Sequence, residues 1–347
     1  MRIIAIATGA AALALALPAA AQDEAATPPS PGEIVAAAPA AEWLAIAPED
    51  LLVMTLAPAA DGAERQVVIQ LMPAPFSQGW VENIRTLARA EWYDGISVNR
   101  VQDNYVVQWG DPYAENAAKA KPLPDGLRVM EETYITKTKT SDLYQMGRLL
   151  ADGARFNGQS RDRPLPPQRS RTSDPYSRNH AFFDGFPLSF STAGSFGTEL
   201  HETSYASPVH CYGMIGVGRG MSPDTGSGAE LYTVIGHAPR HLDRNIALVG
   251  RVIEGIEHLS SLPRGSGDLG FYSADEADER TPITSIRVAA DLPAAERPIF
   301  EYLSTEGASF ARYAEARANR RDPFFIVPAG GADICNIPVP VRRAEPR

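Results

Sequence analysis

Few residues in this chain of 347 stand at spacings typical of a catalytic or metal site. His237 and His241 are four apart, as two ligands on one face of a helix would be, but Pro239 between them breaks such a helix. We therefore expect no metal and no cofactor. The alternating glycines of residues 216–220 lack the strand–turn–helix setting and the Lys of a phosphate-binding loop. No Gly-x-Ser-x-Gly motif occurs to anchor a hydrolase triad.

The chain has two cysteines, Cys211 and Cys335. In an oxidising compartment they could pair, although two cysteines do not make a disulfide scaffold. Cys211 could instead be a small residue of the core. The sequence leaves both states open.

Short β-rich runs dominate the predicted secondary structure, and turn residues precede or separate them. They are residues 51–56, 66–71, 96–107 (two strands), 231–235 and 246–253. One helix is expected after the second run, where four apolar residues share a stripe: Trp80, Ile84, Leu87 and Ala88. Many short strands with one amphipathic helix indicate a β-barrel or sandwich rather than an alternating α/β sheet.

A long polar segment, residues 113–208, separates the earlier strands from the later ones. Within it, residues 155–178 contain six arginines against two aspartates, a local net charge of 6 − 2 = +4 in an acidic protein. We interpret this part as a solvated surface loop. A docking arm for acidic partners or the membrane surface is the alternative.

The last part of the chain is expected to contain a helix within residues 299–321. Its apolar residues at helical spacing are Leu303, Phe310, Tyr313 and Ala314. Residues 319–321 (NRR), followed by Asp322 and Pro323, mark the end of that helix.

The N-terminus has the three parts of a secretory signal. A basic start (residues 1–2) is followed by an apolar run (residues 3–17) and by three alanines before Gln22. The run is too short to span a membrane stably, and no later stretch approaches the roughly 18 apolar residues of a spanning helix. We expect residues 1–21 to be removed, residues 22–41 to be a flexible spacer rich in Ala and Pro, and the mature protein to be periplasmic and not membrane-spanning.

The overall charge limits the classes of partner. The formal net charge is −10 and the pI is near 5.2, which argues against general nucleic-acid binding because that usually needs a basic face. About 305 residues follow the spacer, enough for one large domain with additions.

Eight short blocks resemble the sequence signatures of cyclophilins, in the same order along the chain. They are residues 81–87 (VENIRTL), 93–95 (YDG), 99–101 (NRV), 106–112 (VVQWGDP), 212–219 (YGMIGVGR), 228–232 (GAELY), 241–243 (HLD) and 248–255 (LVGRVIEG). The resemblance covers about residues 50–111 and 210–290. It implies a mainly β fold: a closed barrel of about eight antiparallel strands capped by two helices. The barrel domain would be residues 42–290, with residues 113–208 as a long insertion and residues 291–347 as a C-terminal extension.

Cyclophilins catalyse cis/trans isomerisation of peptidyl-prolyl bonds, and the resemblance implies the same activity here. Rotation about the X-Pro bond faces a barrier of ~20 kcal/mol because the amide has partial double-bond character. Twisting the amide makes the proline nitrogen a better hydrogen-bond acceptor. A cation aimed at that nitrogen and the adjacent carbonyl therefore stabilises the twisted state more than either planar state. Arg100 occupies the family's catalytic position.

The resemblance also assigns a substrate pocket. It comprises Tyr105, Val106 and Tyr232 around the proline ring, His241 and Leu242 at the rim, Gly218 where substrate backbone passes, and Gln108 and Glu230 beside the catalytic arginine. The apolar members could equally be ordinary barrel core. Proline-containing polypeptides are the expected partners.

The chain departs from the family within this pocket. Family members usually carry Phe where this chain has Val98, Tyr105, Leu231 and Tyr232, Gln in place of Glu230, and His in place of Asn99. A carboxylate near Arg100 could pair with its guanidinium, either competing with substrate or holding the group in place. The alternative function is therefore a catalytically weak or inactive module that binds peptides or proteins.

Overall fold

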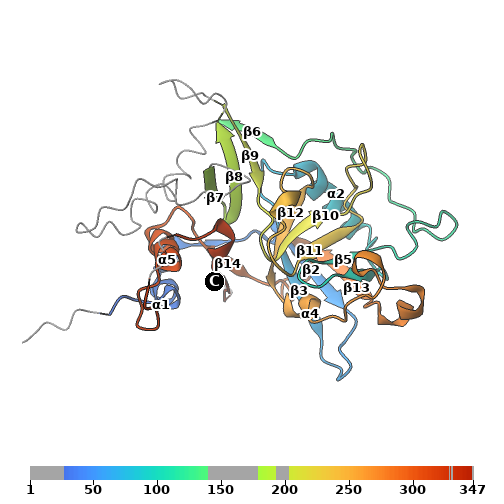
Figure 1. Ribbon diagram of the computed structural model, residues 1–347. Helices are drawn as coiled ribbons and strands as arrows, with labels where there is room; N and C mark the ends of the chain where they lie inside the picture. The colour runs from blue at the N-terminus through green and yellow to red at the C-terminus, as the bar shows by residue number, and fades with distance from the viewer. Residues whose placement is uncertain (1–26, 140–178, 193–202, 328, 330, 346–347) are drawn as a thin grey trace, which may run out of the picture.

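The structure is a computed structural model that describes residues 27–139, 179–192, 203–327, 329 and 331–345. Figure 1 shows two regions side by side: a barrel on the right, and on the left a second group of strands with the helices of the two ends of the chain. The predicted signal segment (residues 1–21) and the arginine-rich segment (residues 155–178) lie outside the described residues.

Eight antiparallel strands form a nearly closed barrel, as predicted. In order around the barrel they are β13 (Ile283–Val288), β2 (Leu51–Leu56), β3 (Arg65–Leu71), β12 (Leu248–Glu254), β10 (Met214–Val217), β11 (Leu231–Val234), β5 (Val106–Gly110) and β4 (Ser97–Val101). The first and last strands of this order meet through the backbone. Ile283 N–H donates to Ile96 O (2.8 Å), and Val98 N–H donates to Thr281 O (2.9 Å). Such closure pairs the edges that an open sheet would expose.

Two helices accompany the barrel, α2 (Gln78–Arg89) and the short α4 (Glu257–Ser260). In Figure 1, α2 lies on the upper side of the barrel and α4 on the lower side. All four residues of the predicted stripe in α2 are buried. On the same helix, Asn83 Nδ2 donates to the carbonyls of Ser227 and Arg128, both at 2.9 Å. The helix thereby fixes the loop that leads into β11.

The long insertion, residues 113–208, contains a four-stranded sheet that the sequence did not predict. The order is β6 (Thr136–Lys139), β9 (Thr203–Pro208), β8 (Phe186–Thr192) and β7 (Asn179–Phe183). A tight turn at Asp184 and Gly185, both at positive φ, joins β7 to β8. An Asp-Gly pair between two such runs is a hairpin signal that the polar composition hid. Phe182, Phe186 and Leu188 bury this sheet against the rest of the molecule.

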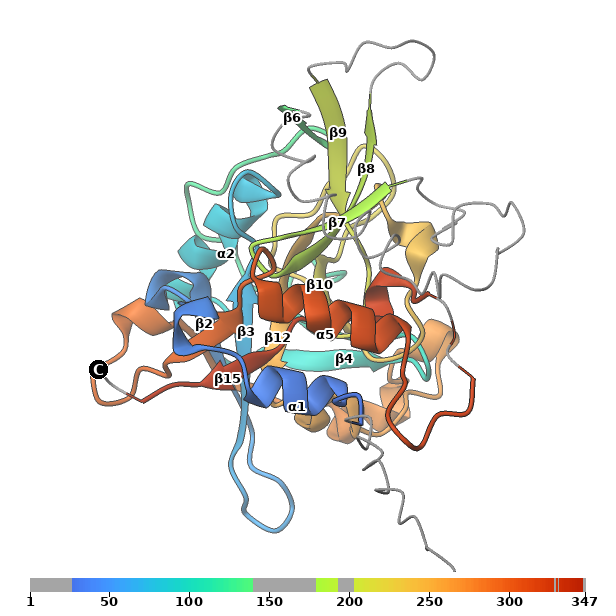
Figure 2. The ribbon, with the colours of Figure 1, turned by 90° about the vertical axis from the view of Figure 1, so that its left-hand side faces the viewer.

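The expected flexible spacer at residues 22–41 is also corrected, because part of it folds. Ser30 caps helix α1 (Pro31–Ala36) through a capping box with Glu33, and Ile34 is buried. Figure 2 shows α1 and α5 (Ala308–Ala318) side by side. An Ala- and Pro-rich segment can therefore order here because a docking surface and a cap are both present.

The C-terminal helix starts later than predicted. Residues Phe300–Leu303 form strand β14, which lies between β1 (Trp43–Ala45) and β15 (Val341–Arg343), and α5 begins only after its N-cap Gly307. The predicted helix wrongly included Leu303, because this residue belongs to a strand that is buried throughout. The predicted end is confirmed, since Asn319 caps the helix.

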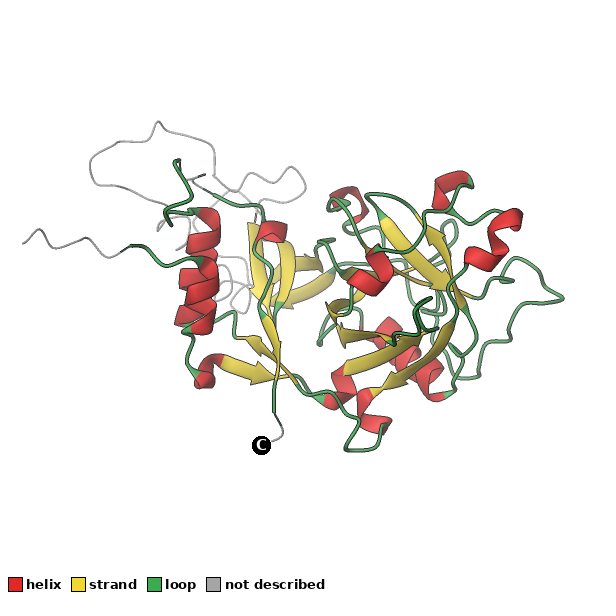
Figure 3. Cartoon of the chain, turned by 90° about the horizontal axis from the view of Figure 1, so that it is seen from below, coloured by secondary structure: helices red, strands yellow, loops and turns green. Residues whose placement is uncertain are grey.

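A disulfide joins Cys211 to Cys335, with Cα atoms 5.0 Å apart. It ties the segment before β10 to the C-terminal extension. We call α1, α5, the β1–β14–β15 sheet and the β6–β9–β8–β7 sheet the outer region; Figure 3 shows it from below, beside the barrel. Among the described residues, no helix combines the length and the apolar character needed to cross a membrane.

Candidate active site

Arg100 lies on β4, and three oxygen atoms hold its guanidinium. Nε donates to the carbonyl of Leu269 (2.7 Å), Nη1 donates to Oε1 of Gln108 (2.9 Å), and Nη2 donates to Oε1 of Gln102. A guanidinium carries an N–H on Nε and a pair of N–H groups on each Nη. These contacts leave one N–H of Nη1 and one of Nη2 for a further acceptor. The group is therefore fixed in place and still able to donate.

Aromatic rings flank the same guanidinium. Its Cζ lies 5.3 Å from the ring centroid of Phe271 and 5.5 Å from that of Tyr105. The Tyr105 ring is in turn nearly parallel to the imidazole of His241, with centroids 6.3 Å apart and 7° between the planes. Tyr105 comes from the turn before β5 and His241 from a short 3-10 helix, Arg240–Leu242. The structure thus brings two predicted pocket residues together next to the predicted catalytic one.

Glu230 reaches Arg100 through Gln108. The Oε1 atom of Gln108 accepts from Arg100, and its Nε2 donates to Oε1 of Glu230. A flipped amide would point its NH₂ group at the guanidinium donors, so the two contacts agree on one orientation. Among the described ion pairs, none joins Arg100 to Glu230. The direct pair considered from the sequence is therefore replaced by an amide relay.

A small apolar cluster lies beside this polar group and separate from the main core. It consists of Val106, Tyr232 and Val234, with Tyr105 and Ile246 packed against it. Val106 on β5 is directly opposite Val234 on β11 in the antiparallel register. The cluster has the apolar character that a pyrrolidine ring needs, and its three central members are largely buried.

The two remaining predicted residues differ in their surroundings. A Cβ on Gly218 would lie 2.6 Å from Oε1 of Glu230, so the glycine makes room for that carboxylate. Leu242 is half-buried in the 3-10 helix, next in the chain to His241 and outside the apolar cluster.

Burial acts on both charged groups of the relay. It lowers the pKa of Arg100, an effect that the nearby Tyr105 and Glu230 oppose; the guanidinium nevertheless stays protonated at neutral pH. Burial also raises the pKa of Glu230, while the hydrogen bond from Gln108 acts to lower it. The site therefore combines a held cation with a carboxylate that resists ionisation.

Behind Tyr232 lies a chain of buried polar side chains that sequence reasoning missed. The Tyr232 hydroxyl is 2.8 Å from Nε2 of His210, and Nδ1 of His210 is 2.8 Å from Oδ1 of Asp243. Oδ2 of Asp243 accepts from Nε of Arg240 (2.6 Å). No local spacing points to this chain, because His210 and Tyr232 are 22 residues apart.

Two side-chain partners of Arg100 were missed as well. Gln102 could have been found, since residues two apart in an extended chain share a face. Phe271 could not, because its contact depends on the path of residues 265–272. That path is fixed by backbone bonds such as Tyr272 N–H to Asn99 O (3.0 Å).

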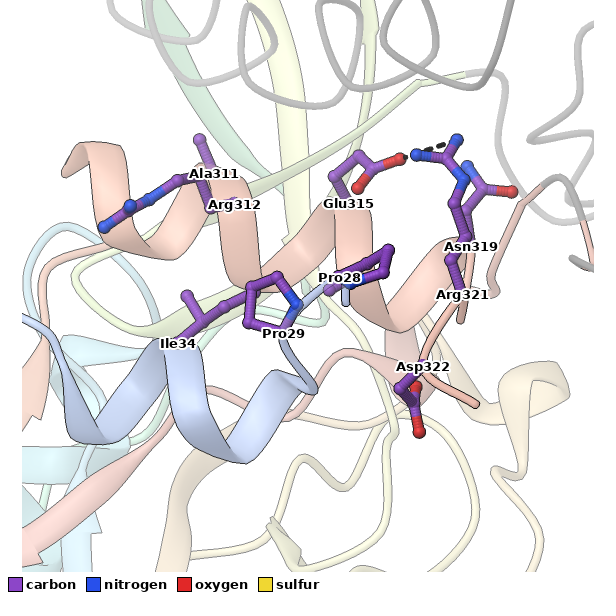
Figure 4. Close-up of a pocket in the computed structure, with 10 residues that line it drawn as sticks. Pro28, Pro29, Ile34, Ala311, Arg312, Glu315, Asn319, Arg321 and Asp322 are labelled. Carbon is purple, nitrogen blue, oxygen red and sulfur yellow. Dashed lines mark ion pairs between the residues drawn. The ribbon is translucent and has the colours of Figure 1, made fainter. Parts of the chain in front are cut away.

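Two cavities lie away from this site, and none of the predicted site residues lines either. Figure 4 shows the first, about 410 Å³, where Pro29 and Ile34 face Ala311 and Glu315 of α5. The second, about 390 Å³, lies between the barrel strand β12 and the C-terminal extension and is bordered by the disulfide.

The chain matches a protein-family model and resembles solved structures in fold. Residues 64–288, more than half of the chain, match the model of the family described as cyclophilin type peptidyl-prolyl cis-trans isomerase/CLD. Among solved structures, cyclophilin AquaCyp293 from Hirschia baltica is similar with a TM-score of 0.61 at 19% identity, over 87% of this chain and 93% of that one. A cyclophilin type peptidyl-prolyl cis-trans isomerase from Cryptosporidium parvum, solved in the presence of the dipeptide ala-pro, gives a TM-score of 0.35 at 11% identity, over 69% and 97% of the two chains. No curated protein matches the sequence.

Proposed function

The chain belongs to the family of cyclophilin type peptidyl-prolyl cis-trans isomerases, and from this premise we propose that it isomerises X-Pro bonds of exported proteins by means of Arg100. Family membership carries the general activity, and with it the binding of proline-containing peptides. The mechanism through Arg100 and the exported class of substrate are the proposal.

The position of Arg100 is the observation that supports the proposed mechanism most strongly. As the amide twists, its nitrogen gains a lone pair that a nearby N–H can bond, and the adjacent carbonyl can take a second N–H. Arg100 keeps one N–H on each of two nitrogens after its contacts to Leu269, Gln108 and Gln102. Because these partners already fix the guanidinium, little reorganisation is needed at the moment of rotation.

The apolar cluster supplies the second part of the mechanism. A proline ring seated on Val106 and Tyr232, with Tyr105 at its side, would place its nitrogen near the guanidinium, since Tyr105 contacts both the cluster and Arg100. The ring would be held while the residue before proline rotates.

Export is supported by two features of the chain. The first is the N-terminal pattern of a basic start, an apolar run and small residues, typical of a cleavable secretory signal. The second is the disulfide between Cys211 and Cys335, since disulfides persist mainly in oxidising compartments such as the periplasm. We therefore propose a periplasmic protein.

A protease-coupled assay on a short Ala-Pro peptide tests the mechanism. Arg100→Ala should lower kcat/KM by ~10²–10³, the usual loss when one preorganised donor is removed. Arg65→Ala is the matched control: its guanidinium bonds the backbone of Ala57 at the far end of β3, and turnover should not change. Wild-type turnover in the Arg100 variant would contradict the mechanism.

One observation favours the second function, a peptide-binding module with little turnover. Val106 and Tyr232 are only 2% and 4% exposed, which leaves a small surface for a proline ring. Wild-type protein that binds the Ala-Pro peptide and leaves its isomerisation at the uncatalysed rate would establish this alternative.

A further inference from the structure

We propose that His210 and Asp243 are positioning residues of the proline pocket, acting through the hydroxyl of Tyr232 to fix the ring against which substrate packs. The inference rests on the proposed function, because that function makes Tyr232 a wall of the pocket. Neither residue belongs to the Arg100 contacts or to the apolar cluster. Their effect on substrate would therefore be indirect.

The hydrogen bonds of His210 determine which atoms donate and which accept. Asp243 Oδ1 accepts from the backbone N–H of His210 (2.9 Å) and lies 2.8 Å from Nδ1 of the same residue. A carboxylate only accepts, so Nδ1 carries the proton and Nε2 is left as an acceptor. The Tyr232 hydroxyl must then donate to Nε2. This single pattern satisfies all three side chains.

Arg240 is the last member of this series of hydrogen-bonded side chains. Arg240 donates from Nε to Asp243 Oδ2 (2.6 Å), and the carboxylate is 1% exposed. Burial alone would raise the pKa of Asp243, but the bonds from His210 and the charge of Arg240 outweigh it and lower the pKa. Burial lowers the pKa of His210, so the imidazole is neutral. An ionised aspartate and a neutral histidine give the geometry just described.

The backbone makes space for this arrangement at one glycine. Gly216 on β10 is the register partner of Tyr232 on β11, and a Cβ at residue 216 would lie 2.3 Å from the Tyr232 hydroxyl oxygen. No real Cβ approaches so closely. The Tyr232 hydroxyl thus passes over Gly216 to reach His210. The planes of the Tyr232 ring and the His210 imidazole are nearly parallel, with an angle of 10° between them.

The Tyr–His–Asp order is also that of a nucleophilic relay, but the surroundings do not fit one. The Tyr232 side chain is buried in the barrel wall, and its hydroxyl is bonded to the imidazole. Burial raises the pKa of this hydroxyl well above its ordinary value. The chain therefore holds a ring; it does not attack a substrate.

A double-mutant cycle on KM and kcat of the full-length protein tests the inference. Tyr232→Phe keeps the ring and removes the hydroxyl; His210→Leu keeps the volume and removes the acceptor. Each should raise KM on the order of 2- to 10-fold, the range for one hydrogen bond, with kcat nearly unchanged. The double variant should be no worse than either single one, since both remove the same link.

Two further variants separate positioning from general loss of stability. His210→Gln can still accept from Tyr232 and donate to Asp243, so it should restore the wild-type KM. Thr233→Val is the matched control on the same strand: it removes a buried hydroxyl that donates to the Met214 carbonyl (3.3 Å), and KM should not change.

Different results would contradict the positioning role of His210 and the proposed isomerase function. Additive effects of Tyr232→Phe and His210→Leu, or an equal rise in KM in the Thr233→Val control, would overturn the inference and leave the function standing. Absence of turnover in the wild-type protein would instead count against the proposed function.

Discussion

The barrel and the outer region are built in different ways. Around Arg100 the barrel surface combines a held cation, an amide, a carboxylate and an apolar cluster. The outer region packs through apolar side chains, as where Phe182 of β7 meets Phe310 of α5 with centroids 5.0 Å apart. The blocks that resemble cyclophilins all fall in the barrel. We infer that the chemistry belongs to the barrel and that the outer region contributes stability.

The two regions nevertheless meet close to the pocket. Cys211 follows His210 in the chain and is bonded to Cys335 of the extension. Asp333 of the extension lies 3.8 Å from the guanidinium of Arg240. Arg240 is the last of the hydrogen-bonded polar side chains behind Tyr232. We therefore expect a change in the C-terminal extension to affect the pocket through Asp333 and Arg240. The division of roles between the barrel and the outer region can be tested by substitutions in each.

The largest expected effect on stability is in the outer region. Phe310 is 1% exposed, and Phe310→Ala should lower the free energy of unfolding by about 3–5 kcal/mol, because burial is lost and a cavity remains. Chemical denaturation measures this change. The isomerase rate per folded molecule should stay at the wild-type value, and a large fall in that rate would break the separation between the regions.

Removal of the disulfide should have the next largest effect. Cys335→Ser opens a link that spans 124 residues of sequence and should cost about 2–4 kcal/mol, as seen for typical disulfides. Denaturation of the oxidised wild-type protein and the variant gives the difference. If the path through Asp333 matters, KM should also rise modestly; an unchanged KM would show that Arg240 holds the polar chain without the extension.

The smallest effect is expected inside the relay. A carboxylate whose folded pKa is raised contributes stability below its unfolded pKa of 4.5 and loses it as the pH rises through the folded pKa. Glu230→Gln should therefore be more stable than wild type at pH 7, and the difference should shrink below pH 4.5. Turnover should stay within about fivefold of wild type, since glutamine can still accept from Gln108. Thermal unfolding at several pH values checks the sign; a variant less stable at pH 7 would contradict it.

The sequence predicted the barrel because its strands carry both local β signals and family blocks. Three elements whose order depends on tertiary contacts did not emerge from the sequence: the hairpin of β7 and β8, α1 on α5, and the strand at Leu303. In the candidate site, Arg100, Gln108 and Glu230 could be placed because they lie within matched blocks, and Tyr105 immediately precedes one. His210 could not, since only the closed barrel brings it to Tyr232.

The role of Arg100 in stabilising the twisted amide is tested most directly by separating peptide binding from bond rotation in Arg100→Lys. NMR exchange measurements on an Ala-Pro peptide give both its Kd and its cis/trans exchange rate at saturation. An ammonium keeps the charge but cannot present the planar fork to nitrogen and carbonyl together. We expect a Kd within a few-fold of wild type and an exchange rate lower by about 10². An exchange rate equal to that of the wild-type protein would contradict a role for Arg100 in stabilising the twisted amide.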